Sequence, residues 1–244
     1  MELMANTTFS SFETSSSISN SNPITANDAA RVSVVLFDYG QVLSAPPNPS
    51  AWAALRAVSG LDEAHLHAAY WEFRHAYDCG ELTGVEYWLA VADRAGVQFN
   101  SAQLLALLAA DIDLWTNLNK PMVKWAAQLQ SAGIRTGVLS NIGDCIGEGI
   151  VTRLPWLAAF DHCTWSYQLK LAKPDPEIYR RTAQALDAEP KDILFIDDRE
   201  ENIAAATALG FQAILYTTHL AFEHEMQARG LGHLLDANSC IPVL

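Results

Sequence analysis

Three aspartates in this sequence come directly after apolar runs that have the length and composition of buried β-strands. Asp38 follows residues 32–37, and Asp197 and Asp198 follow residues 193–196. Carboxylate oxygens are the ligands that Mg²⁺ prefers, and a carboxylate can also attack phosphorus directly. The pattern predicts chemistry on a phosphate group, in which Asp38 forms an aspartyl-phosphate that water later hydrolyses.

A hydroxyl, an amide and a lysine complete the predicted set. Ser140 and Asn141 follow the predicted strand at residues 134–139, and Lys173 stands just before a proline-rich turn that begins a helix. A carboxylate that attacks a phosphate dianion meets repulsion of roughly 4 kcal/mol for each pair of unit charges about 4 Å apart, at an effective dielectric near 20. A metal ion and a lysine would offset this charge, while the hydroxyl and amide would hold phosphate oxygens. Lys170 is an alternative to Lys173 in this role.

Each of these residues also has a purely structural interpretation. Asp38 before Gly40, and the pair at 140–141, have the composition of turns. Asp198 with Glu201 three residues later is a capping pair that could begin a helix. Independent turn residues have no reason to gather three carboxylates, a lysine and a hydroxyl at one place, so the combination favours a functional site.

Strands and helices alternate along most of the chain. Helices are predicted between the strands, with Asn119 and Asp175 as N-terminal caps and Gly133 and Gly210 after the C-terminal ends. This alternation predicts an α/β fold, a Rossmann-like doubly wound parallel sheet whose carboxyl edge gathers the residues described above. The segments predicted to form strands are residues 32–37, 134–139, 162–167, 193–196 and 211–216.

A helical segment interrupts this alternation after the first strand. Residues 49–117 carry apolar residues at helical spacing and contain no strand-like run. We therefore expect a small α-helical cap inserted into a catalytic core formed by residues 31–48 and 118–244. Residues 1–30, rich in Ser, Thr and Asn, are expected to form a disordered tail.

Glycines divide the predicted cap into four helical segments. They are Gly60, Gly80 and Gly96, and the aromatic residues between them recur at the spacing of a buried helical face. We expect most of these aromatic side chains to belong to the core of the cap. The turn at residues 78–81 is instead a polar loop that could reach a neighbouring cleft.

Composition limits the partners and the location of the protein. The chain of 244 residues has a net charge of −13, which argues against nucleic acid or an anionic membrane as the main partner. Its four cysteines show no C-x-x-C spacing, residues 1–30 hold no targeting signal, and no apolar stretch is long enough to span a bilayer. We expect a cytoplasmic monomer or homodimer that acts on a small phosphorylated metabolite.

Four segments resemble, in order, the motifs of the haloacid dehalogenase-like hydrolase superfamily. The resemblance covers about residues 31–216 and includes the position of the helical cap. It is strongest to phosphatases similar to the N-terminal domain of soluble epoxide hydrolase and to bacterial sugar-phosphate phosphatases. The segments are residues 37–43 (FDYGQVL), 138–141 (VLSN), 173–179 (KPDPEIY) and 195–202 (FIDDREEN).

The resemblance implies a role for each residue of the predicted site, together with a cap that opens and closes. It also implies that Mg²⁺ is the cofactor. The implied roles are Asp38 as nucleophile and metal ligand, Ser140 and Asn141 as phosphate binders, Lys173 as stabilising cation, Asp197 and Asp198 as metal ligands directly or through water, and Asn202 as a polar support of the last loop.

One departure from the family pattern concerns proton transfer. Most phosphatases of this family have a second aspartate two residues after the nucleophile, whereas this sequence has Gly40. Gly40 can offer a backbone carbonyl to the metal but cannot move a proton, and general acid–base help is worth about 10²- to 10⁴-fold in rate. We therefore expect a slow enzyme or a substitute proton donor, such as water, Tyr39, His75, Asp78 or Glu81.

Three functional hypotheses follow. The favoured one is an Mg²⁺-dependent phosphatase for a small-molecule phosphomonoester. A metal-independent dehalogenase using the same nucleophile is less favoured, because it would not need the pair Asp197 and Asp198. The third is a non-catalytic protein that binds phosphate or a partner, in which Gly40 marks lost turnover.

Overall fold

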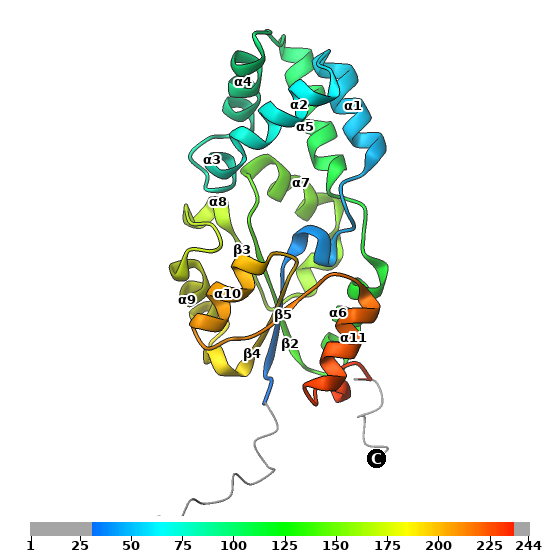
Figure 1. Ribbon diagram of the computed structural model, residues 1–244, viewed down its shortest axis with the longest axis vertical. Coiled ribbons are helices and arrows are strands. Elements are labelled where there is room, and N and C mark those ends of the chain that lie inside the picture. Colours follow the sequence, from blue (N-terminus) through cyan, green and yellow to red (C-terminus); the bar gives the residue numbers. More distant parts are fainter. Residues whose placement is uncertain (1–30, 237–244) are drawn as a thin grey trace, which may run out of the picture.

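The centre of the structure is a five-stranded parallel sheet (Figure 1). The computed structural model describes residues 31–236, so the predicted tail at residues 1–30 lies outside it. The strand order β3-β2-β1-β4-β5 places β1 in the middle and confirms the predicted doubly wound α/β fold. The strands are β1 (Val34–Phe37), β2 (Arg135–Ser140), β3 (His162–Trp165), β4 (Ile193–Asp197) and β5 (Gln212–Leu215).

Helices cover both faces of the sheet because its strands are apolar on both sides. Val35 and Phe37 of β1 belong to one buried cluster, which contains Trp125 and Phe222, whereas Val34 and Leu36 face the other cluster. Figure 1 shows α6 and α11 on the first side and α9 and α10 on the second. The helices of the core, including these four, are α6 (Lys120–Ser131), α7 (Asp144–Arg153), α8 (Ser166–Leu169), α9 (Pro176–Ala185), α10 (Glu200–Ala208) and α11 (His219–Ala228). Short helical turns lie at Tyr39–Leu43, Pro155–Ala159, Pro190–Asp192 and Gly232–Leu234.

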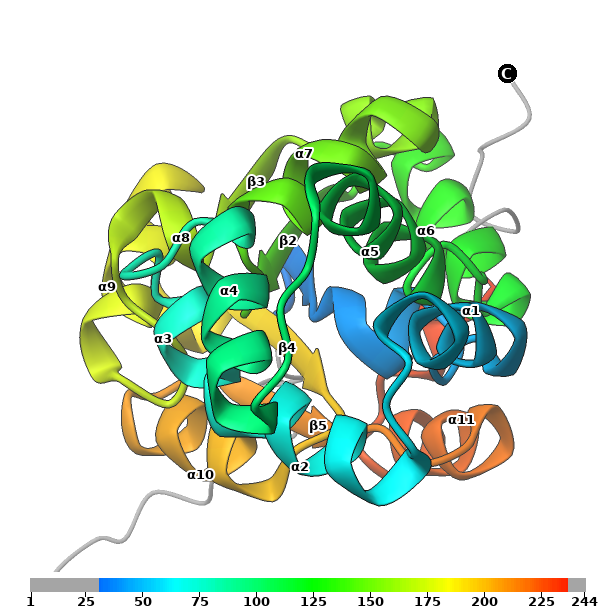
Figure 2. The same ribbon diagram turned by 90° about the horizontal axis from the view of Figure 1, so that it is seen from above.

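Five helices, rather than the four predicted, lie over the carboxyl end of the sheet (Figure 2). Gly60 and Gly96 follow two of them with φ of 69° and 68°, the left-handed conformation in which helices often end. The additional break falls at Phe73, whose φ of −100° and ψ of 3° interrupt the helix without a Gly or Pro to mark the position. We call residues 49–117 the cap; its helices are α1 (Pro49–Ser59), α2 (Glu63–Glu72), α3 (Arg74–Asp78), α4 (Gly84–Ala95) and α5 (Ser101–Leu114).

The two chain segments that join the cap to the core lie side by side. Ser44 and Leu118 form an antiparallel bridge, and Asn119 donates through Nδ2 to the Val42 carbonyl at 2.9 Å and to the Tyr216 hydroxyl at 2.8 Å. Asn119 stands at the N-cap position of α6 as predicted, but its side chain connects these segments and makes no cap hydrogen bond.

Asp175 caps α9 as predicted. Its Oδ1 accepts a hydrogen bond from the Glu177 backbone N–H at 2.7 Å, and Pro176 takes the first helical position. The hydrogen bond from Glu177 to Asp175 fixes where α9 begins. It therefore also fixes where the preceding segment, which contains Lys173, crosses the carboxyl edge of the sheet.

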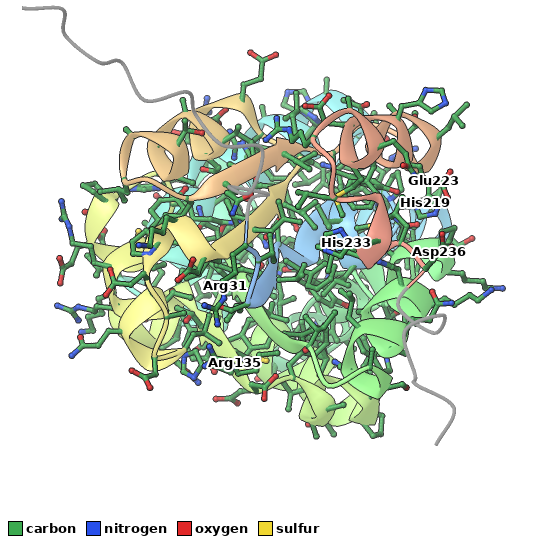
Figure 3. The ribbon with its side chains drawn as sticks, turned by 90° about the horizontal axis from the view of Figure 1, so that it is seen from below. Arg31, Arg135, His219, Glu223, His233 and Asp236 are labelled. Carbon is green, nitrogen blue, oxygen red and sulfur yellow. The ribbon has the colours of Figure 1, made fainter. Side chains whose placement is uncertain are left out.

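Arg135 is the first residue of β2 and lies at the amino end of the sheet, which Figure 3 views from below. It donates through Nη1 to the Leu186 carbonyl at 2.6 Å. On α11, a ring nitrogen of His219 lies 3.5 Å from a carboxylate oxygen of Glu223, and a surface ion pair of this kind contributes little to stability. Within residues 31–236, no helix combines the length and apolar character needed to cross a membrane.

Candidate active site

The carboxyl ends of β1 and β4 place Asp38 beside Asp197. Phe37 pairs with Ile196 in the parallel register, and the Asp38 backbone N–H donates to the Ile196 carbonyl at 2.8 Å. The chain runs from β1 to β2 and β3 on one side and later returns to β4 on the other, so these ends flank the switch point of the topology. Ligands of open α/β sheets bind at such a point.

Lys173 lies between these two aspartates. Its Nζ donates to Asp38 Oδ1 at 2.8 Å, to Asp197 Oδ2 at 2.6 Å and to the Leu139 carbonyl at 2.9 Å. The lysine is only 4% exposed, so these interactions are poorly screened by solvent. Lys170, the alternative, is exposed and follows α8 with a φ of 55°. The structure therefore brings Lys173 to the carboxylates and leaves Lys170 at the surface.

The side chain of Asn141 holds the backbone of Lys173. Its Oδ1 accepts from the Lys173 N–H at 2.7 Å, and its Nδ2 donates to the Lys173 carbonyl at 2.8 Å. Asn141 was expected to bind phosphate, but both ends of its amide are used to position the lysine. Ser140 is buried at the end of β2 and lines a cavity together with Asp38 and Lys173. It therefore supplies the predicted hydroxyl beside these two residues.

Asp197 is completely buried and has hydrogen-bond donors on both oxygens. In addition to Lys173 at Oδ2, its Oδ1 accepts from the Arg199 backbone N–H and from Asn202 Nδ2, both at 2.9 Å. A buried carboxylate with this many donors is fixed in orientation. The contact also confirms the predicted support of this loop by Asn202.

Asp198 does not cap the following helix. Its Oδ2 accepts a hydrogen bond from Gln41 Nε2 at 2.7 Å, while the proposed capping partner Glu201 forms an ion pair with Arg199 at 2.6 Å. The capping interpretation of Asp198 is therefore wrong. Gln41 was not among the predicted site residues; it reaches Asp198 from a left-handed position with a φ of 57°.

The three aspartates form a donor set suited to Mg²⁺. Asp38, Asp197 and Asp198 each offer an oxygen, and these oxygens lie within 4.8 Å of one another. Lys173 contacts two of the three carboxylates, so the cluster has an excess of negative charge that a divalent cation would offset. Oxygen donors of this kind fit a hard cation. Gly40, whose carbonyl was a further predicted ligand, lies beside them, since a Cβ on it would stand 3.6 Å from Asp38 Oδ2.

Burial raises the pKa of Asp38 to about 7, although Lys173 opposes this increase. Because a metal ligand must be deprotonated, we expect Mg²⁺ affinity to increase as the pH rises toward this pKa and to level off above it. The expected slope below the pKa is about tenfold per pH unit for one released proton. Calorimetric titration with Mg²⁺ across this range measures it, with Asp38→Asn as the control that should lose the dependence. A flat profile for the unmodified protein would contradict the assignment of Asp38 as a titrating ligand.

The site residues line a cavity of about 130 Å³ between core and cap. This volume is on the order of four water molecules, so groups on opposite walls can contact one small ligand. Trp71 of α2 is 45% exposed and lines this cavity, in contrast to the buried aromatic residues predicted for the cap. The core contributes Asp38, Gln41, Ser140, Asn141, Lys173, Asp198, Arg199 and Asn202, and the cap contributes Trp71, Arg74, Asp78 and Trp115.

Arg74 is a cavity residue that the sequence analysis missed. It is 8% exposed, and its Nε donates to Asp78 Oδ1 at 2.9 Å while its Nη1 donates to the Tyr70 hydroxyl at 2.5 Å. Tyr70 in turn donates to Asp111 at 2.8 Å. A signal for this cluster was present in the sequence, because Tyr70, Arg74 and Asp78 follow one another at intervals of four residues, the spacing at which helical side chains meet.

Comparison with known proteins gives the class of this chain. The model of the haloacid dehalogenase-like hydrolases matches residues 33–210. The chain belongs to this family of hydrolases, as the resemblance of its motifs indicated.

Two relatives illustrate the range of the family. Bifunctional epoxide hydrolase 2 of Sus scrofa is 32% identical over 199 residues, which is 74% of this chain and 35% of that protein. (S)-2-haloacid dehalogenase 1 of Pseudomonas sp. (strain CBS-3) is 30% identical over 86 residues, which is 35% of this chain and 38% of that protein. The matches therefore span less than two fifths of either relative.

Solved structures share the fold. A haloacid dehalogenase family enzyme of Bacteroides thetaiotaomicron, crystallised with magnesium and inorganic phosphate, superposes with a TM-score of 0.65 at 20% identity and covers 80% of this chain and 98% of its own. L-2-haloacid dehalogenase of Xanthobacter autotrophicus gives a TM-score of 0.59 at 15% identity, covering 85% of this chain and 87% of its own. At these identities the comparison shows the fold alone.

Proposed function

We propose that this protein is an Mg²⁺-dependent phosphatase that hydrolyses a small-molecule phosphomonoester through an aspartyl-phosphate on Asp38. The observation that carries this proposal is the contact of Lys173 with both Asp38 and Asp197 beside a third carboxylate, Asp198. A lysine and a hard-cation donor set next to a nucleophilic carboxylate are what phosphoryl transfer requires. The small cavity supports a compact substrate.

Asp38 is oriented for attack because Lys173 holds one of its two carboxylate oxygens and leaves the other free. Lys173 holds Oδ1, whereas Oδ2 accepts no hydrogen bond from the residues that the structure describes. One oxygen of Asp38 forms a bond to phosphorus while the bond from phosphorus to the ester oxygen breaks and the alcohol leaves. Water then attacks phosphorus, which releases inorganic phosphate and restores the carboxylate.

The surrounding residues stabilise charge during both steps. Asp38, Asp197 and Asp198 would hold Mg²⁺, which when bound neutralises charge on the phosphoryl oxygens. Lys173 adds a fixed positive charge, and the Ser140 hydroxyl donates a hydrogen bond to a phosphoryl oxygen. Asn141 acts by holding the Lys173 backbone in place.

A second candidate function is metal-independent dehalogenation by the same aspartate. It is favoured by the 30% identity over 86 residues with a Pseudomonas haloacid dehalogenase. The three-carboxylate cluster supports the phosphatase instead, because displacement of a halide by Asp38 needs no divalent cation. Binding of phosphate without turnover is the third possibility, and Gly40 is the feature that supports it.

Hydrolysis of 4-nitrophenyl phosphate separates these functions. We expect nitrophenol release in the presence of Mg²⁺, its loss in EDTA and its recovery when excess Mg²⁺ is added. Incubation with 2-chloropropionate under the same conditions provides the comparison. Chloride release that persists in EDTA, without phosphate release in Mg²⁺, would favour the dehalogenase. Phosphate binding without either product, in folded protein, would favour the binding role.

A further inference from the structure

The proposed reaction needs a proton donor that Gly40 cannot provide. Tyr39 is unsuitable, since its hydroxyl is buried and donates to the Trp115 carbonyl at 2.7 Å. His75 and Glu81 are exposed and do not line the cavity that contains Asp38. Asp78, at the end of α3, is the carboxylate that the cap contributes to this cavity.

We propose that Asp78 is the general acid and base of this active site, presented by the cap and oriented by Arg74. The proposal rests on the phosphatase function proposed above. It assigns to the cap a role that the resemblance of the motifs places, for most phosphatases of the family, two residues after the nucleophile.

Arg74 leaves one oxygen of Asp78 free to exchange a proton. Arg74 Nε contacts Asp78 Oδ1 at 2.9 Å, and within the described chain Oδ2 accepts no hydrogen bond. The guanidinium itself is packed over the rings of Tyr70, Tyr77 and Trp115 at 5.5 to 5.6 Å, so it cannot swing away freely. The carboxyl group is therefore held in one orientation at the cavity wall.

The end of α3 at Asp78, and the loop that follows it, are packed directly against the core. Ser166 Oγ donates to the Asp78 carbonyl at 2.5 Å and accepts from the Ile142 N–H at 2.7 Å, which links the loop to the end of β2. Gly80 has a φ of 66°, and a Cβ there would lie 2.6 Å from the Tyr167 carbonyl oxygen. This close approach requires glycine and fixes the distance between the loop and the core.

The proton balance uses Asp78 twice. As the bond from phosphorus to the ester oxygen breaks, the Asp78 carboxyl gives its proton to that oxygen. The resulting carboxylate then takes a proton from the water that attacks phosphorus, so Asp78 ends the cycle protonated. Burial raises the pKa of Asp78 while the ion pair with Arg74 opposes this, and the net increase favours the protonated form needed first.

Leaving groups of different basicity test the acid role. Nitrophenolate leaves without a proton, whereas phenolate is more basic and needs one. For Asp78→Asn we expect kcat/KM to fall by about 10²- to 10⁴-fold with phenyl phosphate and by less than about tenfold with 4-nitrophenyl phosphate. Asp93→Asn, an exposed change on α4 outside the cavity, is the matched control and should leave both values unchanged.

Loss of Asp78 as the base should slow the second step, in which water hydrolyses the aspartyl-phosphate. With 4-nitrophenyl phosphate, Asp78→Asn is expected to release about one equivalent of nitrophenol rapidly and then turn over slowly, because breakdown of the aspartyl-phosphate needs the base. The additional change Gly40→Asp should restore part of the lost rate. Gly40 has φ −64° and ψ 124°, and a Cβ there meets its nearest neighbours at 3.6 and 3.9 Å, so a side chain fits.

The outcomes distinguish this inference from the function on which it rests. Selective loss with phenyl phosphate, the burst and the rescue by Gly40→Asp support Asp78 as acid and base. An equal loss with both esters, or no loss, in a variant with an unchanged melting temperature would overturn this role while the phosphatase function stands. Absence of Mg²⁺-dependent turnover by the unmodified protein would overturn both.

Discussion

Replacement of Lys173 by methionine is expected to lower the free energy of unfolding by about 3–5 kcal/mol and to reduce turnover by at least about 10²-fold. The lysine is buried and is the cation in contact with both Asp38 and Asp197. Without it, two carboxylates remain close together in a low-dielectric environment, which is the situation in which breaking a buried ion pair costs most. Turnover falls because the phosphoryl oxygens lose a fixed positive charge.

The pH dependence of stability gives this prediction a second readout. Burial raises the pKa of Asp38 and Lys173 opposes this increase, so without Lys173 the folded-state pKa of Asp38 should lie further above that of the unfolded chain. Stability is then lost as the pH rises from the unfolded toward the folded pKa, because only the unfolded state is readily ionised there. The deficit of Lys173→Met relative to the unmodified protein should therefore be smaller in acid than at neutral pH.

Chemical denaturation of metal-free protein measures these differences, with Lys170→Met as the matched control. Lys170 lies three residues away, is exposed and forms no ion pair within the described residues. The control should retain both stability and turnover. Equal effects of the two substitutions would contradict the position of Lys173 between the carboxylates.

Replacement of Asp38 by asparagine is expected to remove turnover by a factor on the order of 10⁴ to 10⁶ while the protein stays folded. The amide keeps the size of the side chain and can still accept from Lys173, but it does not attack phosphorus. Because burial raises the pKa of Asp38, replacing this carboxylate by a neutral group should cost little stability at neutral pH. Loss of activity and loss of stability are thereby separated, unlike in Lys173→Met.

Asp198→Asn provides the contrast to Asp38→Asn. Asp198 belongs to the cluster of three carboxylates but forms no hydrogen bond with Lys173, and its Oδ2 accepts from Gln41 instead. We expect this variant to need more Mg²⁺ for half-maximal turnover and to recover activity at high Mg²⁺, whereas Asp38→Asn should not recover. Steady-state rates across a series of Mg²⁺ concentrations measure both. Recovery of Asp38→Asn by Mg²⁺ would show that Asp38 acts only as a metal ligand.

The fold and the main site residues could be predicted because both depend on local sequence patterns. Buried parallel strands are continuous apolar runs, and the first polar residue after each run marks its carboxyl end. Asp38, Ser140 and Asp197 were found in this way. Their convergence followed from the parallel topology alone, and the register of β1 with β4 confirms it for Asp38 and Asp197.

Other parts of the site depend on contacts between distant segments. The sequence could not decide between Lys170 and Lys173, because the choice depends on the short helix α8 and on the two hydrogen bonds from Asn141. Arg74 comes from the cap, and Gln41 reaches Asp198 across 157 residues of sequence. The break at Phe73 separates α2 from α3, and it has no Gly or Pro that would predict it.

Trapping the phosphorylated enzyme tests the central claim most directly. The protein is mixed with 4-nitrophenyl phosphate and Mg²⁺, quenched in acid within the first turnover, digested and analysed by mass spectrometry. We expect phosphate on the peptide that contains Asp38, labile to hydroxylamine as an acyl phosphate is, and its absence from Asp38→Asn. Nitrophenol release at an Mg²⁺-dependent rate with no phosphorylated peptide, or with phosphate on another residue, would contradict the assignment of Asp38 as the nucleophile.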